Sequence, residues 1–144
     1  GRLDYTEFNP IREHEVKIEY CVKIRQNKDG ENEPCKGDPT TLKKVGQVER
    51  LFCDADYILI VDNSAWQSCN STVQQEALIH RGLMKINIDT SEKGIKVTTR
   101  KPDIVEITAT VMRFGAYNDP LLNFREAFSL AAKRVAEELQ PENV

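Results

Sequence analysis

The sequence predicts an α+β domain, a fold in which a small sheet packs against separate helices. Residues 16–24 alternate between apolar and polar side chains, which is the two-residue period of a strand with one solvent-facing side. Residues 57–61 form a continuous apolar run between two aspartates, typical of a buried central strand. Residues 70–87 and 119–139 carry apolar side chains at helical spacing. These patterns predict a small sheet with a central buried helix and two C-terminal helices.

Length and composition favour one ordinary globular domain. The chain has 144 residues, of which 40% are hydrophobic and 30% charged, enough to bury a core. The net charge of −3 argues against nucleic acid or an anionic membrane as a partner. No apolar run approaches the ~20 residues of a membrane span, and no secretory signal is visible. We therefore expect a cytoplasmic protein, with an N-terminal arm over residues 1–15 and a single domain over residues 16–140.

The four cysteines favour reduced thiols over a metal site or a disulfide framework. Their spacing matches neither a zinc ribbon nor a dense set of bridges, and the chain is long enough to fold without either. They are Cys21, Cys35, Cys53 and Cys69.

The segments between the predicted strands are more ambiguous. Residues 26–38 are rich in Gly, Pro, Asn and Asp and predict a long loop or a hairpin excursion. Residues 39–52 repeat apolar side chains every third position, which predicts a partly helical segment that Gly46 could divide into a short strand and a helix. Residues 62–64 are expected to turn the chain into a short helix around Trp66.

The helix predicted over residues 70–87 is the centre of the chain. Ser71 or Thr72 can cap its first turn, with Gln74 or Gln75 as the partner in a capping box. Two apolar stripes predict a helix buried over most of its circumference; they comprise Val73, Ala77, His80 and Met84, and Ile79, Leu83 and Ile86.

The rest of the chain predicts a hairpin or an irregular excursion, followed by two helices. Within residues 88–101, Gly94 lies in a polar turn, and the side chains after it alternate at Ile95, Val97 and Thr99. Asp103 is expected to cap a helix with Glu106 as its capping-box partner, and Gly115 to end it. Asp119 and Pro120 are then expected to begin the last helix, as its N-cap and its first residue. Its expected buried face comprises Leu121, Phe124, Phe128, Ala131, Val135 and Leu139.

The run EALIHRGLMKI, residues 76–86, resembles the active-site helix of the phage and prophage metallopeptidases, a zincin-like family. The family's run reads roughly EALVDHELxHx, after a DFVI-type strand and an alanine–tryptophan pair. This chain has Asp56 to Ile60, then Ala65 and Trp66, in the same order. The family's later HDVEEF-type run is similar to residues 102–107 here. The resemblance covers roughly residues 43–125 and implies a zincin-like fold.

The same resemblance implies a lost metal site. An HExxH motif needs two histidines four residues apart to hold zinc and a glutamate between them as general base. The histidine positions fall on Arg81 and Lys85, the glutamate position on Gly82, and the third ligand on Pro102. Cationic side chains offer no lone pair to a metal. We therefore expect no cofactor and no peptidase activity.

Four other residues are candidates for binding or chemistry. Glu76 and His80 lie one helical turn apart and could form a general base or half of a metal site, although a histidine satisfied by a carboxylate explains the pair more simply. Glu106 matches the family's acidic residue, which could orient a ligand. Trp66 matches the family's tryptophan, which fits a core residue or a binding hot spot.

Three functions follow from these residues. The first is a non-catalytic phage-type protein that binds a host or phage protein, acting as an inhibitor of host or defence proteins. The second is a metal-dependent hydrolase with a relocated site around His80 and Glu76. The third is a nucleic-acid-binding protein, against which the acidic charge argues. Arg81 and Lys85 are expected either to fill the lost metal site by pairing with Glu76 or Glu106, or to bind an anion.

Overall fold

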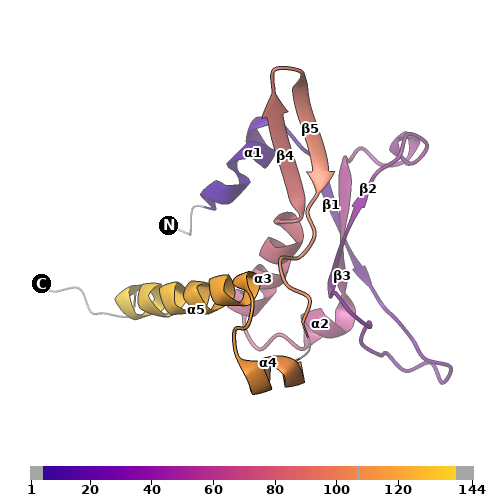
Figure 1. Ribbon diagram of the computed structural model, residues 1–144. Helices are drawn as coiled ribbons and strands as arrows, with labels where there is room; N and C mark the ends of the chain where they lie inside the picture. Colours follow the sequence, from indigo (N-terminus) through magenta and orange to yellow (C-terminus); the bar gives the residue numbers. More distant parts are fainter. Residues whose placement is uncertain (1–4, 107, 139–144) are drawn as a thin grey trace, which may run out of the picture. The chain divides into compact units, whose positions relative to one another are not determined.

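The computed structural model describes residues 5–106 and 108–138. The chain forms two compact units, residues 1–101 and residues 102–144, and each is described by itself. Two small sheets lie in the first unit, and the second is helical (Figure 1). The predicted α+β class is therefore confirmed. No described helix has the length and the apolar composition needed to span a membrane.

The larger sheet contains three strands in the order β1-β3-β2. The central strand β3, Tyr57–Asp62, pairs in parallel with β1, Ile18–Lys23, and antiparallel with β2, Thr40–Lys44. Both strands expected from the sequence are present. Residues 39–52 form β2 and then one 3-10 turn, η2, Glu49–Leu51, so the expected helix is reduced to that turn. Backbone pairing of residues 40–44 with β3 outweighs the weak helical spacing of their side chains.

Alternate side chains of β3 form the centre of the core. Leu59 is fully buried, and Tyr57 and Val61 are nearly so. They face helix α3, Thr72–Leu83, which packs against β2 and β3. Asp62 ends β3 and caps the short helix α2, Asn63–Gln67, by accepting a hydrogen bond from the amide of Ala65. This is the turn into a helix around Trp66 that the sequence predicts.

Helix α3 begins where expected and ends early. Ser71 accepts a hydrogen bond from the amide of Gln74 at 3.3 Å, and the Gln74 side chain accepts one from the amide of Asn70 at 2.6 Å. The helix stops at Leu83, because residues from Ile86 onward pair in the hairpin of β4, Ile86–Ser91, and β5, Gly94–Thr99. It is also less enclosed than two apolar stripes predict: Val73 is 71% exposed.

The N-terminal arm contributes to the core. It forms a 3-10 turn, η1, Thr6–Phe8, and a short helix α1, Asn9–Glu13. The Phe8 ring is buried, and Pro10 and Ile11 lie near Met84 and Ile86 at the junction of α3 and β4.

The second unit contains helices α4, Thr108–Phe114, and α5, Asp119–Glu138. Residues 103–106 are not helical, so the capping box expected at Asp103 and Glu106 is wrong. Gly115 ends α4 with a φ of +67°, as predicted. Asn118, one residue before the expected cap, accepts a hydrogen bond from the amide of Leu121 at 3.0 Å.

The apolar face of α5 is largely exposed, contrary to expectation. Phe124 is 40% exposed, Phe128 73% and Val135 50%. Helical spacing shows which side chains can be buried together, but burial also requires an element that covers them. Leu139, the last residue of the expected face, lies outside the described residues.

Candidate functional site

One carboxylate holds both cations of the central helix. Asp38 lies in the loop before β2, and its Oδ2 is 2.6 Å from the ammonium of Lys85, just past the end of α3. Its Oδ1 accepts a hydrogen bond from the Arg81 guanidinium, one turn earlier. Arg81 also donates to the hydroxyl of Thr40 at 3.3 Å, and Lys85 donates to the Thr40 carbonyl. The cluster therefore joins α3 to the start of β2.

The cluster is partly shielded from water. The Lys85 side chain is 13% exposed and that of Asp38 30%, while Thr40 is buried. Burial alone would raise the pKa of Asp38, but hydrogen bonds from Lys85, the Thr40 amide and Arg81 outweigh burial and lower this pKa to about 2. Asp38 is therefore charged at neutral pH, and one anion faces two cations.

Gly82 lies between the two cations, at the point where the helix contacts Leu59 of the central strand. A Cβ at Gly82 would come within 3.0 Å of one methyl group of Leu59 and closer still to the other. Glycine in a helix costs about 1 kcal/mol relative to alanine. The contact with fully buried Leu59 explains why the chain carries glycine here.

Glu76 and His80 each bind the N-terminal arm. The Tyr5 hydroxyl donates to Glu76 at 3.0 Å, and His80 Nε2 lies 2.6 Å from a carboxylate oxygen of Glu7. The His80 ring also lies 5.0 Å from the ring of Phe8, centroid to centroid. The two residues share a helix face, as expected, but their described contacts attach the arm to α3.

Glu106 and Trp66 lie on other segments of the chain. Glu106 belongs to the second unit, where it accepts a hydrogen bond from Tyr117 and so raises the pKa of that phenol. Trp66 is half-buried on α2. The partner of Arg81 and Lys85 is therefore Asp38, in place of the expected Glu76 or Glu106.

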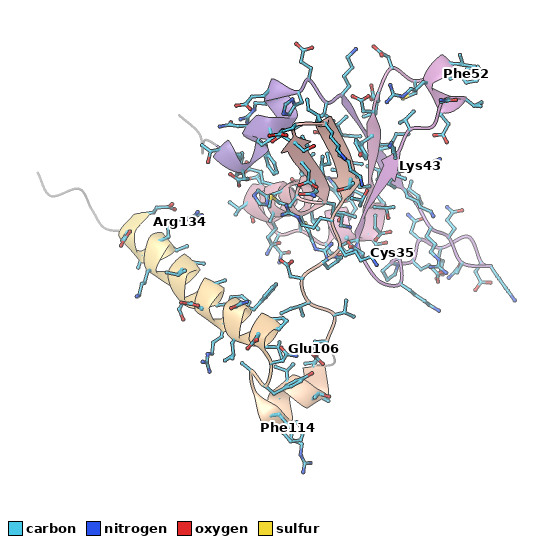
Figure 2. The ribbon with its side chains drawn as sticks, turned by 45° about the horizontal axis from the view of Figure 1, so that its top comes forward. Cys35, Lys43, Phe52, Glu106, Phe114 and Arg134 are labelled. Atoms are coloured by element: carbon cyan, nitrogen blue, oxygen red, sulfur yellow. The ribbon has the colours of Figure 1, made fainter. Side chains whose placement is uncertain are left out.

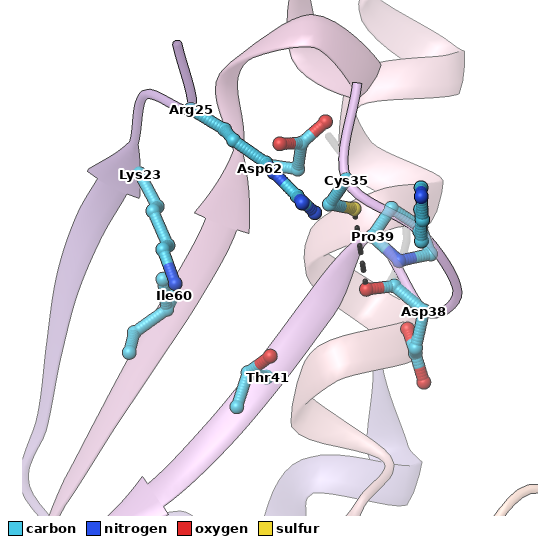
Figure 3. A pocket seen from close by; sticks show the side chains of 9 residues that line it. Lys23, Arg25, Cys35, Asp38, Pro39, Thr41, Ile60 and Asp62 are labelled. Atoms are coloured by element: carbon cyan, nitrogen blue, oxygen red, sulfur yellow. Dashed lines mark hydrogen bonds between the residues drawn. The ribbon is translucent and has the colours of Figure 1, made fainter. Parts of the chain in front are cut away.

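A pocket of about 230 Å³ opens on the sheet near the carboxyl ends of β1 and β3. Lys23 and Ile60 come from these strands, and Cys35 and Asp38 come from the loop (Figure 3). The Cys35 thiol donates to the Asp38 carbonyl at 3.6 Å. Burial, followed by the negative charge of Asp62, raises the pKa of this thiol, which makes it a poor nucleophile. All four cysteines are free thiols.

The side chains at the expected ligand positions do not fit a zinc ion. Arg81 and Lys85 are cations without a free lone pair, and both are bound to Asp38. Within residues 5–106 and 108–138, no three His, Cys, Asp or Glu side chains are grouped so that they could hold a metal ion.

A family model described as "Putative phage metallopeptidase" matches residues 3–137, nearly the whole chain, and the protein belongs to this family. No curated protein matches the chain. No solved structure matches it either.

Asp38 and Thr40 are the site residues that sequence reasoning missed. Asp38 is separated from Arg81 by 43 positions and lies in a polar loop with many similar residues. Its position two residues before strand β2 gave a weak local signal, because a strand end restricts the side chains near it. Only the pairing of β2 with β3 and the packing of α3 place it beside the two cations.

Proposed function

We propose that this protein is a non-catalytic member of the phage metallopeptidase family, in which an internal ion-pair cluster replaces the metal site. One observation carries the proposal: Asp38 binds both Arg81 and Lys85, the two residues that the sequence resemblance aligns with the family's histidine ligands. A metal dication is replaced by two fixed cations, and the loop carboxylate neutralises one of their charges. The cluster joins α3 to β2, which supports a structural role for Arg81 and Lys85.

The general-base position supports the same proposal. A glutamate at position 82 would have to place its Cβ against Leu59, where no space is available. Restoring the catalytic residue would therefore require the Leu59 side chain, the strand or the helix to move. The arm contacts of His80 and Glu76 give no support to a relocated hydrolytic site.

The test of lost catalysis is metal content together with activity. Protein purified without chelator should contain far less than one zinc per chain by elemental analysis. It should cleave no unfolded protein substrate when zinc is added. The Gly82→Glu variant should remain inactive because Arg81 and Lys85 still occupy the ligand positions. Stoichiometric tightly bound zinc, or zinc-dependent proteolysis by the unmodified chain, would overturn the proposal.

We further propose that the chain acts by binding a host or phage protein, as an inhibitor of host or defence functions. The support is an exposed apolar knob around η2, formed by Val48, Leu51 and Phe52. These side chains are 71%, 79% and 89% exposed, and Phe52 extends outward from η2 (Figure 2). Adjacent exposed apolar side chains are typical of protein-binding surfaces.

Two double variants test whether the partner binds at the apolar knob or at Arg81 and Lys85. In affinity purification from host lysate, Leu51→Ser with Phe52→Ser should lose a protein that the unmodified chain retains. Arg81→Gln with Lys85→Gln should lose stability but retain the partner in its folded fraction. The opposite result, a stable Arg81/Lys85 variant whose affinity falls by about tenfold, or 1.4 kcal/mol, would show that the two cations bind the partner.

A further inference from the structure

Strand β1 has a free edge with exposed apolar side chains. In the described part of the chain it pairs only with β3. Tyr20 and Val22 are each 55% exposed, and Ile24, directly after the strand, is 58% exposed. Free edges offer unpaired backbone groups to another strand unless charges, prolines or bulges protect them.

The hydrogen bonds to β3 show which backbone groups of β1 face outward. The carbonyl of Lys17 accepts hydrogen bonds from the amides of Asp56 and Tyr57, at 2.8 and 3.2 Å. Backbone groups alternate in direction along a strand, so the odd-numbered residues of β1 face β3. The amides and carbonyls of Ile18, Tyr20, Val22 and Ile24 therefore face the free edge.

The sequence of this edge is self-complementary in one antiparallel register. In this register Cys21 lies opposite Cys21 of a second copy. Tyr20 then lies opposite Val22, and Ile18 lies opposite Ile24. Each of these two pairs occurs on both sides of the two-fold axis. These are the residues whose backbone groups face outward, so all of them would be in hydrogen-bonded pairs. Their side chains lie on the same face as Leu59 and Val61 of β3, so the two apolar rows would meet.

Charges agree with the same register. Glu19 lies opposite Lys23 of the second copy, so two ion pairs form across the two-fold axis. The only like-charged pair is Lys17 with Arg25, at the ends. Each of these cations already has an acid of its own: Lys17 is 2.9 Å from Asp54, and Arg25 is 3.3 Å from Glu33.

From this edge we propose that β1 binds β1 of a second copy of the chain, antiparallel about Cys21, to form a continuous six-stranded sheet. The proposal is independent of the loss of catalysis. A single pair of short strands buries little surface, so the dimer is expected to be weak and to form at high protein concentration. Crosslinking detects such a dimer more readily than co-elution does.

The decisive experiment mixes two charge variants. Glu19→Lys alone places lysine opposite Lys23, and Lys23→Glu alone places glutamate opposite Glu19, so each variant repels itself. In a mixture, both cross-strand pairs become attractive, although both variants keep a net negative charge. The mixture should give roughly tenfold more crosslinked heterodimer than either variant gives homodimer, because two repulsive pairs become attractive. Lys93→Glu, on the β4–β5 turn, is the matched control and should crosslink like the unmodified chain.

The crosslink is a disulfide between the two Cys21 thiols, in a background where the other three cysteines are serine. Diamide takes up the two electrons and two protons that the thiols release. The two Cys21 residues would form a non-hydrogen-bonded pair. The Cα atoms of such a pair lie about 4.5 Å apart, within the range of about 4.4–6.8 Å for a disulfide. Moving the cysteine to position 20 should abolish trapping, because the two Tyr20 positions are offset by two residues along the strands.

Both protein variants should melt like the unmodified chain, since Glu19 and Lys23 are exposed. Equal crosslinking of the mixture and the separate variants, or equal trapping from positions 20 and 21, would overturn the proposal. A dimer of the unmodified chain that persists after Tyr20→Lys with Val22→Lys would also do so.

Discussion

At the scale of single residues, the first unit depends on Asp38 and Gly82. Asp38 neutralises one of the two charges of Arg81, on α3, and Lys85, just past its end, and it also accepts a hydrogen bond from the amide of Thr40 at 2.9 Å. Gly82 allows α3 to approach β3 closely enough for these contacts to form. Each residue has a measurable energetic consequence.

Replacing Asp38 with asparagine should destabilise the protein by about 1–3 kcal/mol at pH 7, because Lys85 keeps its charge in a largely buried position. The pKa of Asp38 is about 2 in the folded state, below its ordinary value of 3.8. This carboxylate therefore stabilises the fold fully above about pH 4, and the contribution is lost as the pH falls through 2. Urea unfolding at pH 7 and pH 3 should show a smaller difference between the two proteins at the lower pH.

Asp54→Asn is the matched control for Asp38, because the Asp54 side chain is 92% exposed in its ion pair with Lys17. Exposed pairs contribute little, so this variant should unfold like the unmodified chain. Equal losses for the two asparagine variants would contradict the role assigned to Asp38.

Gly82→Ala should destabilise the protein by about 1–2 kcal/mol. Helix propensity favours alanine by about 1 kcal/mol, whereas overpacking a core typically costs about 1–3 kcal/mol. Since Leu59 is fully buried, we expect the clash to prevail. Chemical unfolding of Gly82→Ala, Leu59→Ala and the double variant should show that the two changes are not additive. Stabilisation by Gly82→Ala would show that Leu59 moves aside without cost.

At the scale of elements, the N-terminal arm binds one face of α3. Two helix residues, Glu76 and His80, bind the arm residues Tyr5 and Glu7. The rings of Tyr5 and Phe8 lie against the His80 ring at 5.7 and 5.0 Å. The face of α3 that the sequence suggested for a general base therefore binds a segment far away in the sequence.

Phe8→Ala should destabilise the first unit by about 3 kcal/mol, since truncating a buried phenylalanine removes apolar contacts and leaves a cavity. Thermal melting followed by circular dichroism measures the change. Phe52→Ala, at an 89% exposed position, should leave the melting temperature nearly unchanged. Similar melting of the two variants would mean that the arm adds little to the fold.

At the scale of the whole molecule, the chain belongs to a metallopeptidase family, and Asp38 binds Arg81 and Lys85, the two residues that the proposed function aligns with zinc ligands. The first unit also has a core of its own, centred on Leu59, Tyr57 and Val61. Folding of the chain should therefore not depend on a metal ion.

The melting temperature should be the same with and without excess chelator. Structural zinc sites contribute on the order of 10 kcal/mol to folding, so a zinc site that supports the fold would be obvious. Differential scanning calorimetry of protein dialysed against chelator is the measurement, and readdition of zinc is the control. A drop of many degrees on chelation, reversed by zinc, would contradict the prediction.

The sequence by itself determined the local elements. The alternating pattern of residues 16–24, the apolar run of residues 57–61 and the turn at Gly94 correspond to β1, β3 and the β4–β5 hairpin. The order of short runs around residues 76–86 was also sufficient to reveal the family. These signals lie within a few neighbouring residues, where steric and periodic constraints act directly.

Only the tertiary structure decided where the elements stop and which side chains meet. The expected helix over residues 70–87 ends at Leu83, because Ile86 pairs with Thr99 in the hairpin. Asp38 reaches Arg81 and Lys85 only after β2 joins β3 and α3 packs on both. Ion pairs form between groups that are close in space, and a separation of 43 positions along the chain carries no signal for such closeness.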